Sequence, residues 1–367
     1  MAMRPTIMKI STEAVAANAR LIRSKVPDRV KLMCVVKADA YGHDAVAVAR
    51  KLLTAGADAF CVAIVEEARQ LRDAGIDRPI LILGGACEDS LREAVRVGAS
   101  QAVYTPEALD ILQNEAARAG KKALAHLKVD TGMSRIGVRD LAALDALLVR
   151  WRSCPDVVME GVFTHYCVAD TDPAFTRAQD ARFCEALARV HAAGFHPIAH
   201  AAATSALLDP EYQHDMVRAG IGLYGTGLPG LEAELRYGQT LVTKPIRIER
   251  IAAGDTVGYG RTFTAKRDSV IMTLPIGYGD GYPRILSNRA SVLVRGRRAP
   301  QVGRVCMDMI MADITDVPGV TLEDEVVLMG AQGTERISPD ELAEQAQTIP
   351  YEIMLGFGPR VTREIVD

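Results

Sequence analysis

KLMCVVKADAYGHD, residues 31–44, is the stretch that separates two fold classes. It begins with an apolar run that fits a buried strand and continues into a turn of small and polar residues. An open, doubly wound sheet that binds a dinucleotide carries GxGxxG in its first strand-to-helix turn. KADAYGHD lacks that pattern. The stretch therefore favours a closed (β/α)8 barrel over the open sheet.

Seven more short apolar runs follow this first one. They are mostly continuous in hydrophobicity and rich in Val, Ile and Leu, which is typical of parallel strands buried on both faces. Eight such strands alternating with helices fit a single barrel. The eight predicted strands are 31–37, 59–64, 79–85, 101–105, 123–130, 157–165, 196–203 and 217–225.

Amphipathic segments lie between these runs. TPEALDILQNEAARAG, residues 105–120, opens with a Thr N-cap and a Pro at the first helical position, and it closes on a glycine. Residues 65–75 and 172–194 show similar helical spacing. We therefore predict a (β/α)8 barrel over residues 10–235.

The pattern changes after residue 235. Short β-like runs are separated there by Gly, Pro and Asp turns, and ISPDELAEQAQ (337–347) predicts one short helix. We predict a mainly antiparallel β domain over residues 236–367, which residues 1–9 join.

Composition excludes several classes of protein. Apolar residues make up 49% of the chain, charged residues make up 24%, and the net charge is −3, so nothing indicates a nucleic-acid partner. Neither a signal peptide nor a run of roughly 18 apolar residues appears, so we expect a cytoplasmic protein with no membrane partner. The 7 cysteines are widely spaced and lack CxxC, which predicts reduced thiols and no metal site.

Several polar residues follow the predicted strands, where barrel active sites lie. Lys37 either caps a strand at the surface or supplies a desolvated amine able to form a Schiff base. His165 is either a hydrogen-bonded core residue or a site residue. Arg218, inside an apolar strand, needs either a structural partner or a ligand.

A phosphate site is a second expectation. Thr204, Ser205 and the segment RAGIGLYG (218–225) either cap local structure or bind phosphate, as loops after the last strands of barrels often do. Tyr259, between two glycines, is either an ordinary turn residue or an acid–base group. A lysine amine, a phosphate cradle and a tyrosine together suggest pyridoxal 5′-phosphate.

The chain resembles the alanine racemase family over nearly its whole length. VVKADAYGHD resembles the family's pyridoxal phosphate lysine motif. One motif would be weak evidence, but eight in the family's order are specific. They are VVKADAYGHD (35–44), DTGMSRIGV (130–138), GVFTH (161–165), RAGIGLYG (218–225), VGYGRTF (257–263), IGYGDGYPR (276–284), VGRVCMDM (302–309) and PYE (350–352).

The resemblance implies an isomerase that interconverts L- and D-alanine and supplies D-alanine for peptidoglycan. Members are head-to-tail homodimers with shared active sites. Lys37 would bind pyridoxal 5′-phosphate covalently and act as one base, and Tyr259 from the other subunit would act as the second. The remaining implied roles are Tyr41, Tyr351, Ser205 and the backbone of Gly220 and Ile221 at the phosphate, His165 on the ring, Arg218 at the pyridine nitrogen, Arg135 and the backbone of Met307 at the substrate carboxylate, and Lys128 at a position that some members carbamylate.

Two stretches depart from the family pattern. AATSAL (202–207) places Thr204 where HANSAA is common, and the ending GFGPRVTREIVD differs from many members. Neither change touches a predicted base. A serine or broad-specificity racemase, a fold-related decarboxylase and a non-catalytic pyridoxal phosphate carrier remain as alternatives. The familiar carrier is a barrel alone, so the domain bearing Tyr259 argues against it.

Overall fold

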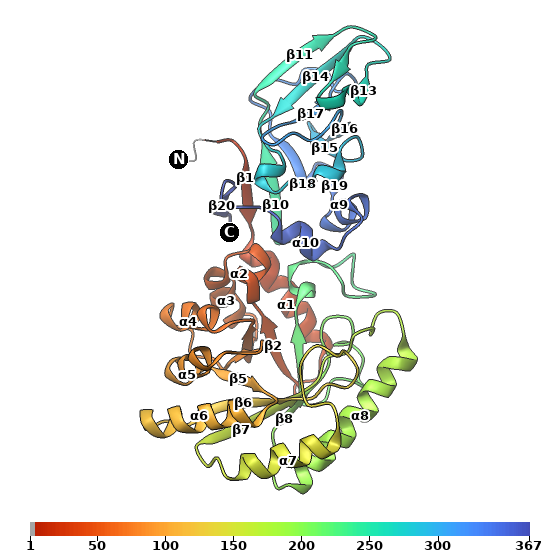
Figure 1. Cartoon of the computed structure of the whole chain (residues 1–367). Helices are drawn as coiled ribbons and strands as arrows, with labels where there is room; N and C mark the ends of the chain where they lie inside the picture. Colours follow the sequence, from red (N-terminus) through yellow and green to blue (C-terminus); the bar gives the residue numbers. More distant parts are fainter. Residues whose placement is uncertain (1–3) are drawn as a thin grey trace. The chain divides into compact units, whose positions relative to one another are not determined.

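A computed structural model describes residues 4–367. The chain forms two compact units, a barrel unit and a β unit (Figure 1). The barrel unit contains residues 15–40 and 44–236, and the β unit contains residues 4–14, 41–43 and 237–367. Of the N-terminal segment predicted to join the β domain, residues 1–3 lie outside the described part.

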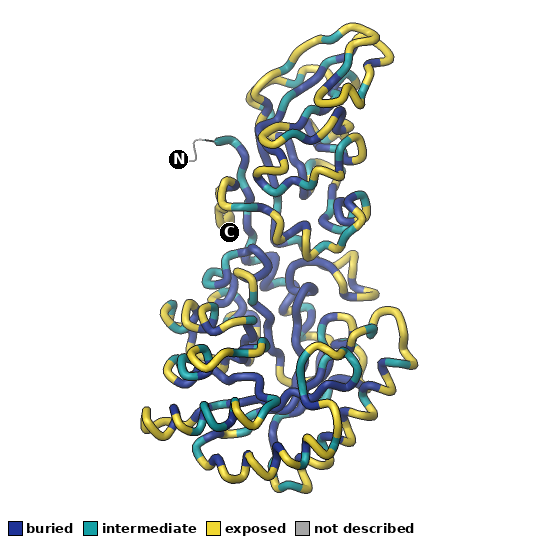
Figure 2. The backbone as a smooth tube through the Cα atoms, in the orientation of Figure 1, coloured by how far each residue is buried: buried dark blue, intermediate teal, exposed yellow. Residues whose placement is uncertain are grey.

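Eight parallel strands form the nearly closed barrel, in the order β8-β7-β6-β5-β4-β3-β2-β9. A parallel bridge between Ala203 and Arg218 links the segment after β8 to β9. Most strand residues are buried, as continuous apolar runs require (Figure 2). All eight predicted strands are present, and the predicted fold class is confirmed. The strands are β2 (Lys31–Val35), β3 (Ala59–Val62), β4 (Ile80–Ile82), β5 (Ser100–Val103), β6 (Ala123–Lys128), β7 (Val157–Phe163), β8 (Ile198–His200) and β9 (Met216–Ala219).

Helices connect the barrel strands. The Thr105 side chain accepts a hydrogen bond from the Ala108 N–H at the start of α6, and Gly120 ends that helix in the left-handed conformation, as predicted. The helices are α1 (Thr12–Lys25), α2 (Lys37–Gly42), α3 (Ala45–Leu53), α4 (Val65–Asp73), α5 (Glu88–Val97), α6 (Pro106–Ala119), α7 (Leu141–Arg152), α8 (Pro173–Ala192) and the 3-10 helix η1 (Ile221–Tyr224).

The short helix α2 has an unusual hand. Residues 38–41 have φ between 52° and 54°, and Gly42 follows at 81°, so this turn is a left-handed helix. Such a helix costs non-glycine L-residues roughly 1–2 kcal/mol each. The predicted turn after β2 is therefore a short left-handed helix, a strained element.

The last predicted strand is shorter than expected. RAGIGLYG was predicted as strand throughout, but β9 ends at Ala219 and η1 follows. The Thr204 hydroxyl accepts the N–H groups of Gly220 and Gly222, at 3.0 and 3.4 Å. The two N–H groups therefore bond to a side chain and do not extend β9.

The β unit contains a large sheet of order β16-β15-β18-β10-β1-β20, with β19 on β18, and two smaller sheets, β11-β14-β17 and β12-β13. Among described residues, every strand pair of this unit is antiparallel except β1 with β20. Its elements are β1 (Ile7–Ile10), β10 (Gln239–Thr243), β11 (Arg247–Ile251), β12 (Thr256–Val257), β13 (Phe263–Thr264), β14 (Ser269–Leu274), β15 (Ser291–Val294), β16 (Arg297–Pro300), β17 (Ile310–Asp313), β18 (Val326–Gln332), β19 (Glu335–Ile337), β20 (Thr362–Ile365), α9 (Pro339–Ala346), α10 (Pro350–Leu355) and the 3-10 helices η2 (Tyr259–Arg261), η3 (Tyr278–Asp280) and η4 (Arg284–Leu286).

Apolar side chains of β1, β10, β14, β15 and β18 form the core of this unit, together with residues of α9 and α10. Across residues 4–367, no helix combines the length and apolar character that crossing a bilayer demands.

Candidate active site

Lys37 is fixed through its main-chain neighbours. The Val36 N–H donates to the Cys61 carbonyl at 2.9 Å, and the Ala38 N–H donates to Glu67 Oε1 at 2.5 Å. Glu67 also accepts the Ala63 N–H at 2.7 Å, so its carboxylate connects the ends of two neighbouring strands. The lysine is thereby held one residue beyond the end of β2, after Val36, at the carboxyl end of the barrel strands.

Arg218 lies on β9 and is 3% exposed. Its NH1 donates to His200 Nδ1 at 2.9 Å, and NH2 donates to the carbonyls of Thr164 and Ala201 and to His165 Nδ1. These acceptors are all neutral. Burial lowers the pKa of Arg218 to about 10, so the guanidinium remains charged at neutral pH.

The histidine tautomers follow from the arginine. A guanidinium can only donate, so His165 and His200 must accept through an unprotonated Nδ1. His200 then carries its proton on Nε2 and donates it to His126 Nδ1, 2.9 Å away. Arg218, His200 and His126 therefore form one directed hydrogen-bond chain inside the barrel. Burial, followed by the charge of Arg218, lowers the pKa of His126 to about 3.

His165, directly after the Thr164 that follows β7, is surrounded by cations. Burial is the largest cause of its low pKa, about 3, and the charge of Arg218 is the next. The other charges that lower it are Arg135, Lys128 and Lys37. These four predicted site residues therefore act on one imidazole, which is neutral at pH 7.

Lys128 ends β6 and is 3% exposed. Its Nζ donates to the Val129 carbonyl at 2.7 Å and lies 5.3 Å from the centre of the Phe163 ring. Burial and the charge of Arg218 lower its pKa to about 7, although Asp130 opposes them. A substantial fraction of this amine is thus neutral near physiological pH.

Arg135 is exposed, in the loop after β6. Burial raises the pKa of Asp130, but the N–H groups of Ser134 and Gly132 outweigh it, and the net pKa is lowered. The ionised carboxylate accepts both N–H groups at 3.0 Å and so shapes the loop that carries Arg135. A Cβ on Gly137 would lie 2.7 Å from the Asp130 nitrogen, so the loop needs glycine there.

The residues predicted to bind phosphate come from both units. In the barrel unit, Ser205 is exposed beside the turn of Thr204, and Gly220 and Ile221 are buried where η1 begins. In the β unit, Tyr41 and Tyr351 lie together with ring centres 5.8 Å apart, although 310 residues separate them in sequence. Tyr41 is 5% exposed and Tyr351 is 37% exposed.

Tyr259 and Met307 occupy glycine-punctuated loops of the β unit. Gly258 and Gly260 flank Tyr259 with φ of 73° and 72°, and the tyrosine is 71% exposed. The Gly279 N–H donates to the Met307 carbonyl at 2.8 Å. A Cβ on Gly277 would lie 2.3 Å from the Cys306 carbonyl oxygen, so glycine lets the two loops approach.

Sequence reasoning missed three residues that support the site: His126, His200 and Glu67. His200 ends β8, so the strand-end rule could have selected it. His126 lies within β6 and gave no separate signal. Its ring needs Gly161, where a Cβ would lie 2.2 Å from Nδ1.

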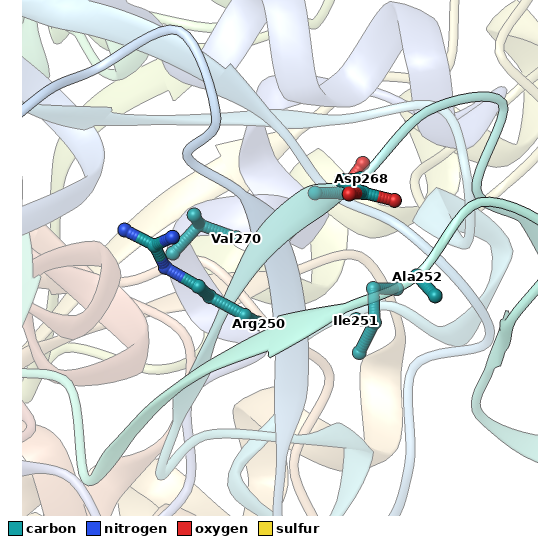
Figure 3. Close-up of a pocket in the computed structure, with 6 residues that line it drawn as sticks. Arg250, Ile251, Ala252, Asp268 and Val270 are labelled. Atoms are coloured by element: carbon teal, nitrogen blue, oxygen red, sulfur yellow. The ribbon is translucent and has the colours of Figure 1, made fainter.

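A surface groove of about 400 Å³ lies on β11 and β14 of the β unit (Figure 3). None of the residues that line it is a predicted site residue. They are Arg250, Ile251, Ala252, Asp268, Ser269 and Val270.

The fold and the strand-end residues define a class: a (β/α)8-barrel protein with a lysine, a buried arginine and neutral histidines at the barrel's carboxyl end, followed by a β domain. Family models refine this class. Residues 10–227 match the alanine racemase N-terminal domain, and residues 239–365 match the alanine racemase C-terminal domain. The chain belongs to the alanine racemase family.

Individual relatives agree with this assignment. "Alanine racemase" of Symbiobacterium thermophilum is 45% identical over 98% of this chain and 97% of its own length. A crystal structure of alanine racemase from Bacillus anthracis with bound L-Ala-P has 34% identity and a TM-score of 0.91, covering 99% of this chain and 95% of that one. Alanine racemase from Bartonella henselae, with covalently bound pyridoxal phosphate, has 29% identity and a TM-score of 0.88, covering 99% of both chains.

Proposed function

We propose that this protein racemises alanine, using pyridoxal 5′-phosphate bound at the carboxyl end of the barrel. The observation that carries the proposal is the buried Arg218, whose hydrogen-bond acceptors are all neutral and whose charge, with that of Lys37, lowers the pKa of His165. A charged donor of this kind suits a ligand with an unprotonated ring nitrogen. Full-length relatives named alanine racemase support the choice of substrate.

The donor set fits the cofactor. Lys37 provides an amine, Arg218 a donor with no readily lost proton, and Ser205, Tyr41 and Tyr351 provide hydroxyls for a phosphate, along with the backbone of Gly220 and Ile221. His165 is neutral and can stack against an aromatic ring. When bound, pyridoxal phosphate acidifies the α-proton of an attached amino acid by spreading negative charge into its ring.

Racemisation requires a proton to leave one face of the α-carbon and another to reach the opposite face. Two groups on opposite sides satisfy this requirement, and we assign them to Lys37 Nζ and Tyr259 Oη. Arg135 and the backbone of Met307 bind the substrate carboxylate in this scheme. Arg218 keeps its proton, so it would donate a hydrogen bond to the ring nitrogen without protonating it.

We infer that the protein works as a homodimer in which each subunit supplies Tyr259 to the other's site. The phenol is 71% exposed, and Met307 is 53% exposed. A base that must exclude water to control proton transfer needs a covering surface, and a second copy supplies one. We further assign the enzyme to the cytoplasm, where D-alanine serves peptidoglycan synthesis.

The test is direct. The purified protein, loaded with pyridoxal phosphate, is incubated with L-alanine, and D-alanine is followed by chiral chromatography. We expect equal amounts of both enantiomers at the end. Absence of D-alanine would overturn the proposal. Serine, run in parallel, distinguishes a narrow racemase from a broad one, and carbon dioxide release would indicate a decarboxylase.

A further inference from the structure

A second group of chemically active side chains lies in the barrel unit, away from the residues assigned above. Asp180 and Cys184 are four residues apart on α8, which places them on one face of the helix. His214 comes from the segment that leads into β9. One ligand atom from each, a carboxylate oxygen, a thiol sulfur and an imidazole nitrogen, lie within 4.8 Å of one another.

The contacts within this group are specific. Asp180 Oδ1 accepts a hydrogen bond from His214 Nε2 at 2.8 Å, and the Cys184 sulfur lies 3.7 Å from Asp180 Oδ2. The orientation of the His214 ring is also fixed, because Phe183 packs edge-on against it with ring centres 5.1 Å apart. The Nε2 atom of His214 is thereby directed at the carboxylate.

A supporting residue orients the carboxylate. The Tyr166 hydroxyl donates to Asp180 Oδ1 at 2.5 Å. Burial raises the pKa of Asp180, but the hydrogen bonds from His214 and Tyr166 outweigh it, so the net pKa is lowered and the group is ionised. Metal ligands typically have outer partners of this kind, which fix their orientation.

The exposure of Cys184 gives a metal ion a path into this group of side chains. Cys184 is exposed, whereas Asp180 and His214 are only partly exposed. One sulfur, one nitrogen and one oxygen ligand form a set typical of zinc, and three protein ligands leave a fourth position for water. Calcium and magnesium prefer oxygen ligands throughout, so this set selects against them.

We propose that Asp180, Cys184 and His214 form a binding site for a zinc-like divalent cation. The metal binds the thiolate of Cys184, Nε2 of His214 and one oxygen of Asp180, with water as the fourth ligand. The thiol releases one proton to solvent, and the proton on His214 Nε2 is replaced by the metal while Nδ1 carries the ring proton. Because the thiol must lose its proton to bind the metal, occupancy increases with pH.

Such a site would join α8 to the segment that leads into the strand of Arg218. Asp180 and Cys184 lie on α8, whereas His214 lies two residues before β9, the strand of Arg218. Tyr166, which orients Asp180, follows His165 in the chain. A bound cation therefore ties α8 to the entry of β9, and we expect it to stabilise the barrel unit.

Cobalt(II) is the probe, because a tetrahedral cobalt–thiolate centre absorbs through sulfur-to-metal charge transfer and intense d–d bands. The full chain, loaded with pyridoxal phosphate, is titrated with cobalt(II) and difference spectra are recorded. We expect these bands to saturate at one cobalt per chain and to be displaced by zinc. No thiolate band, or d–d bands as weak as those of octahedral cobalt, would overturn the site.

Variants identify the ligands. Cys184→Ser should abolish the charge-transfer band and weaken cobalt binding at least about tenfold. Cys167→Ser is the matched control, because Cys167 is also exposed and contacts α8 through Gln179, but it lies outside the group. Loss of the band in Cys167→Ser with retention in Cys184→Ser would contradict the assignment.

Stability gives a second readout. Zinc in excess should raise the melting temperature of the native chain by several degrees and leave Cys184→Ser unchanged. Trp151, the single tryptophan, is buried in α7, so its fluorescence reports the barrel unit. Equal shifts in both proteins would also count against the site.

Discussion

The two proposed bases occupy opposite kinds of surroundings. Lys37 lies between hydrogen bonds from Val36 and Ala38, in a unit where Arg218 is buried and hydrogen-bonded to His200 and His165. Tyr259 lies on an exposed 3-10 turn held open by two glycines. In the proposed scheme, the barrel therefore holds its base between fixed main-chain contacts, whereas the β unit offers a phenol on an exposed turn.

The largest expected effect falls on the barrel half of this comparison. Lys37→Ala should lower racemisation by at least about 10⁴-fold, since it removes one proton-transfer group and the amine that binds the cofactor. Chiral chromatography measures the rate, and borohydride reduction followed by mass spectrometry measures the lysine–cofactor bond. Lys31→Ala, at the exposed start of β2, is the control and should behave as the native protein. A racemising Lys37→Ala variant would remove Lys37 from the mechanism.

The variant Tyr259→Phe tests the proposed base of the β unit. We expect a loss of about 10²–10⁴-fold in racemisation, because a positioned acid–base group is removed. The lysine–cofactor bond should persist, since Tyr259 belongs to the other unit. Solvent deuterium exchange separates the two bases: exchange into L-alanine should be lost, while exchange into D-alanine continues. Unchanged exchange into L-alanine would favour a different second base.

Acid stability sharpens the contrast between buried and exposed histidines. The pKa of His126 is about 3 in the folded barrel and roughly 6.5 when unfolded, so the unfolded state binds its proton first as pH falls. The contribution of neutral His126 to the free energy of unfolding is complete above about pH 6.5. It is lost toward pH 3, at about 1.4 kcal/mol per pH unit. His200, whose pKa is also lowered by burial, adds to this loss.

Urea unfolding followed by Trp151 fluorescence measures this slope. His191→Gln is the control, because that histidine is exposed on α8 and should leave the slope unchanged. His126→Gln should flatten it. A barrel whose stability is independent of pH between 6.5 and 4 would contradict the neutral histidine chain.

The smallest expected effect concerns Lys128. With a pKa of about 7, its neutral amine can react with carbon dioxide, and the carbamate would place a negative charge near Arg135. We expect a carbamate signal in ¹³C NMR with labelled bicarbonate, absent from Lys128→Gln. That variant should raise the KM for alanine about tenfold, or about 1.4 kcal/mol. Lys122→Gln is the exposed control. A signal that persists in Lys128→Gln would refute the carbamate.

The barrel was predictable because each strand is a short, continuously apolar run. Strand-end positions then selected Lys37 and His165, and a charge inside an apolar strand selected Arg218. The hydrogen-bond chain of Arg218, His200 and His126 was not predictable, because packing across the barrel alone brings these residues together. The truncated β9 was missed because Thr204 captures the N–H groups of the following glycines. The assigned roles remain predictions for the experiments above.

The left-handed turn after Lys37 has a stereochemical consequence. Ala38 and Ala40, with φ of 52°, have the backbone hand that mirror-image residues prefer. In a semisynthetic chain, D-alanine at exposed position 38 should relieve roughly 1–2 kcal/mol of strain. The protein is proposed to make D-alanine. At position 38 of its own backbone, that D-residue would fit better than the encoded L-alanine.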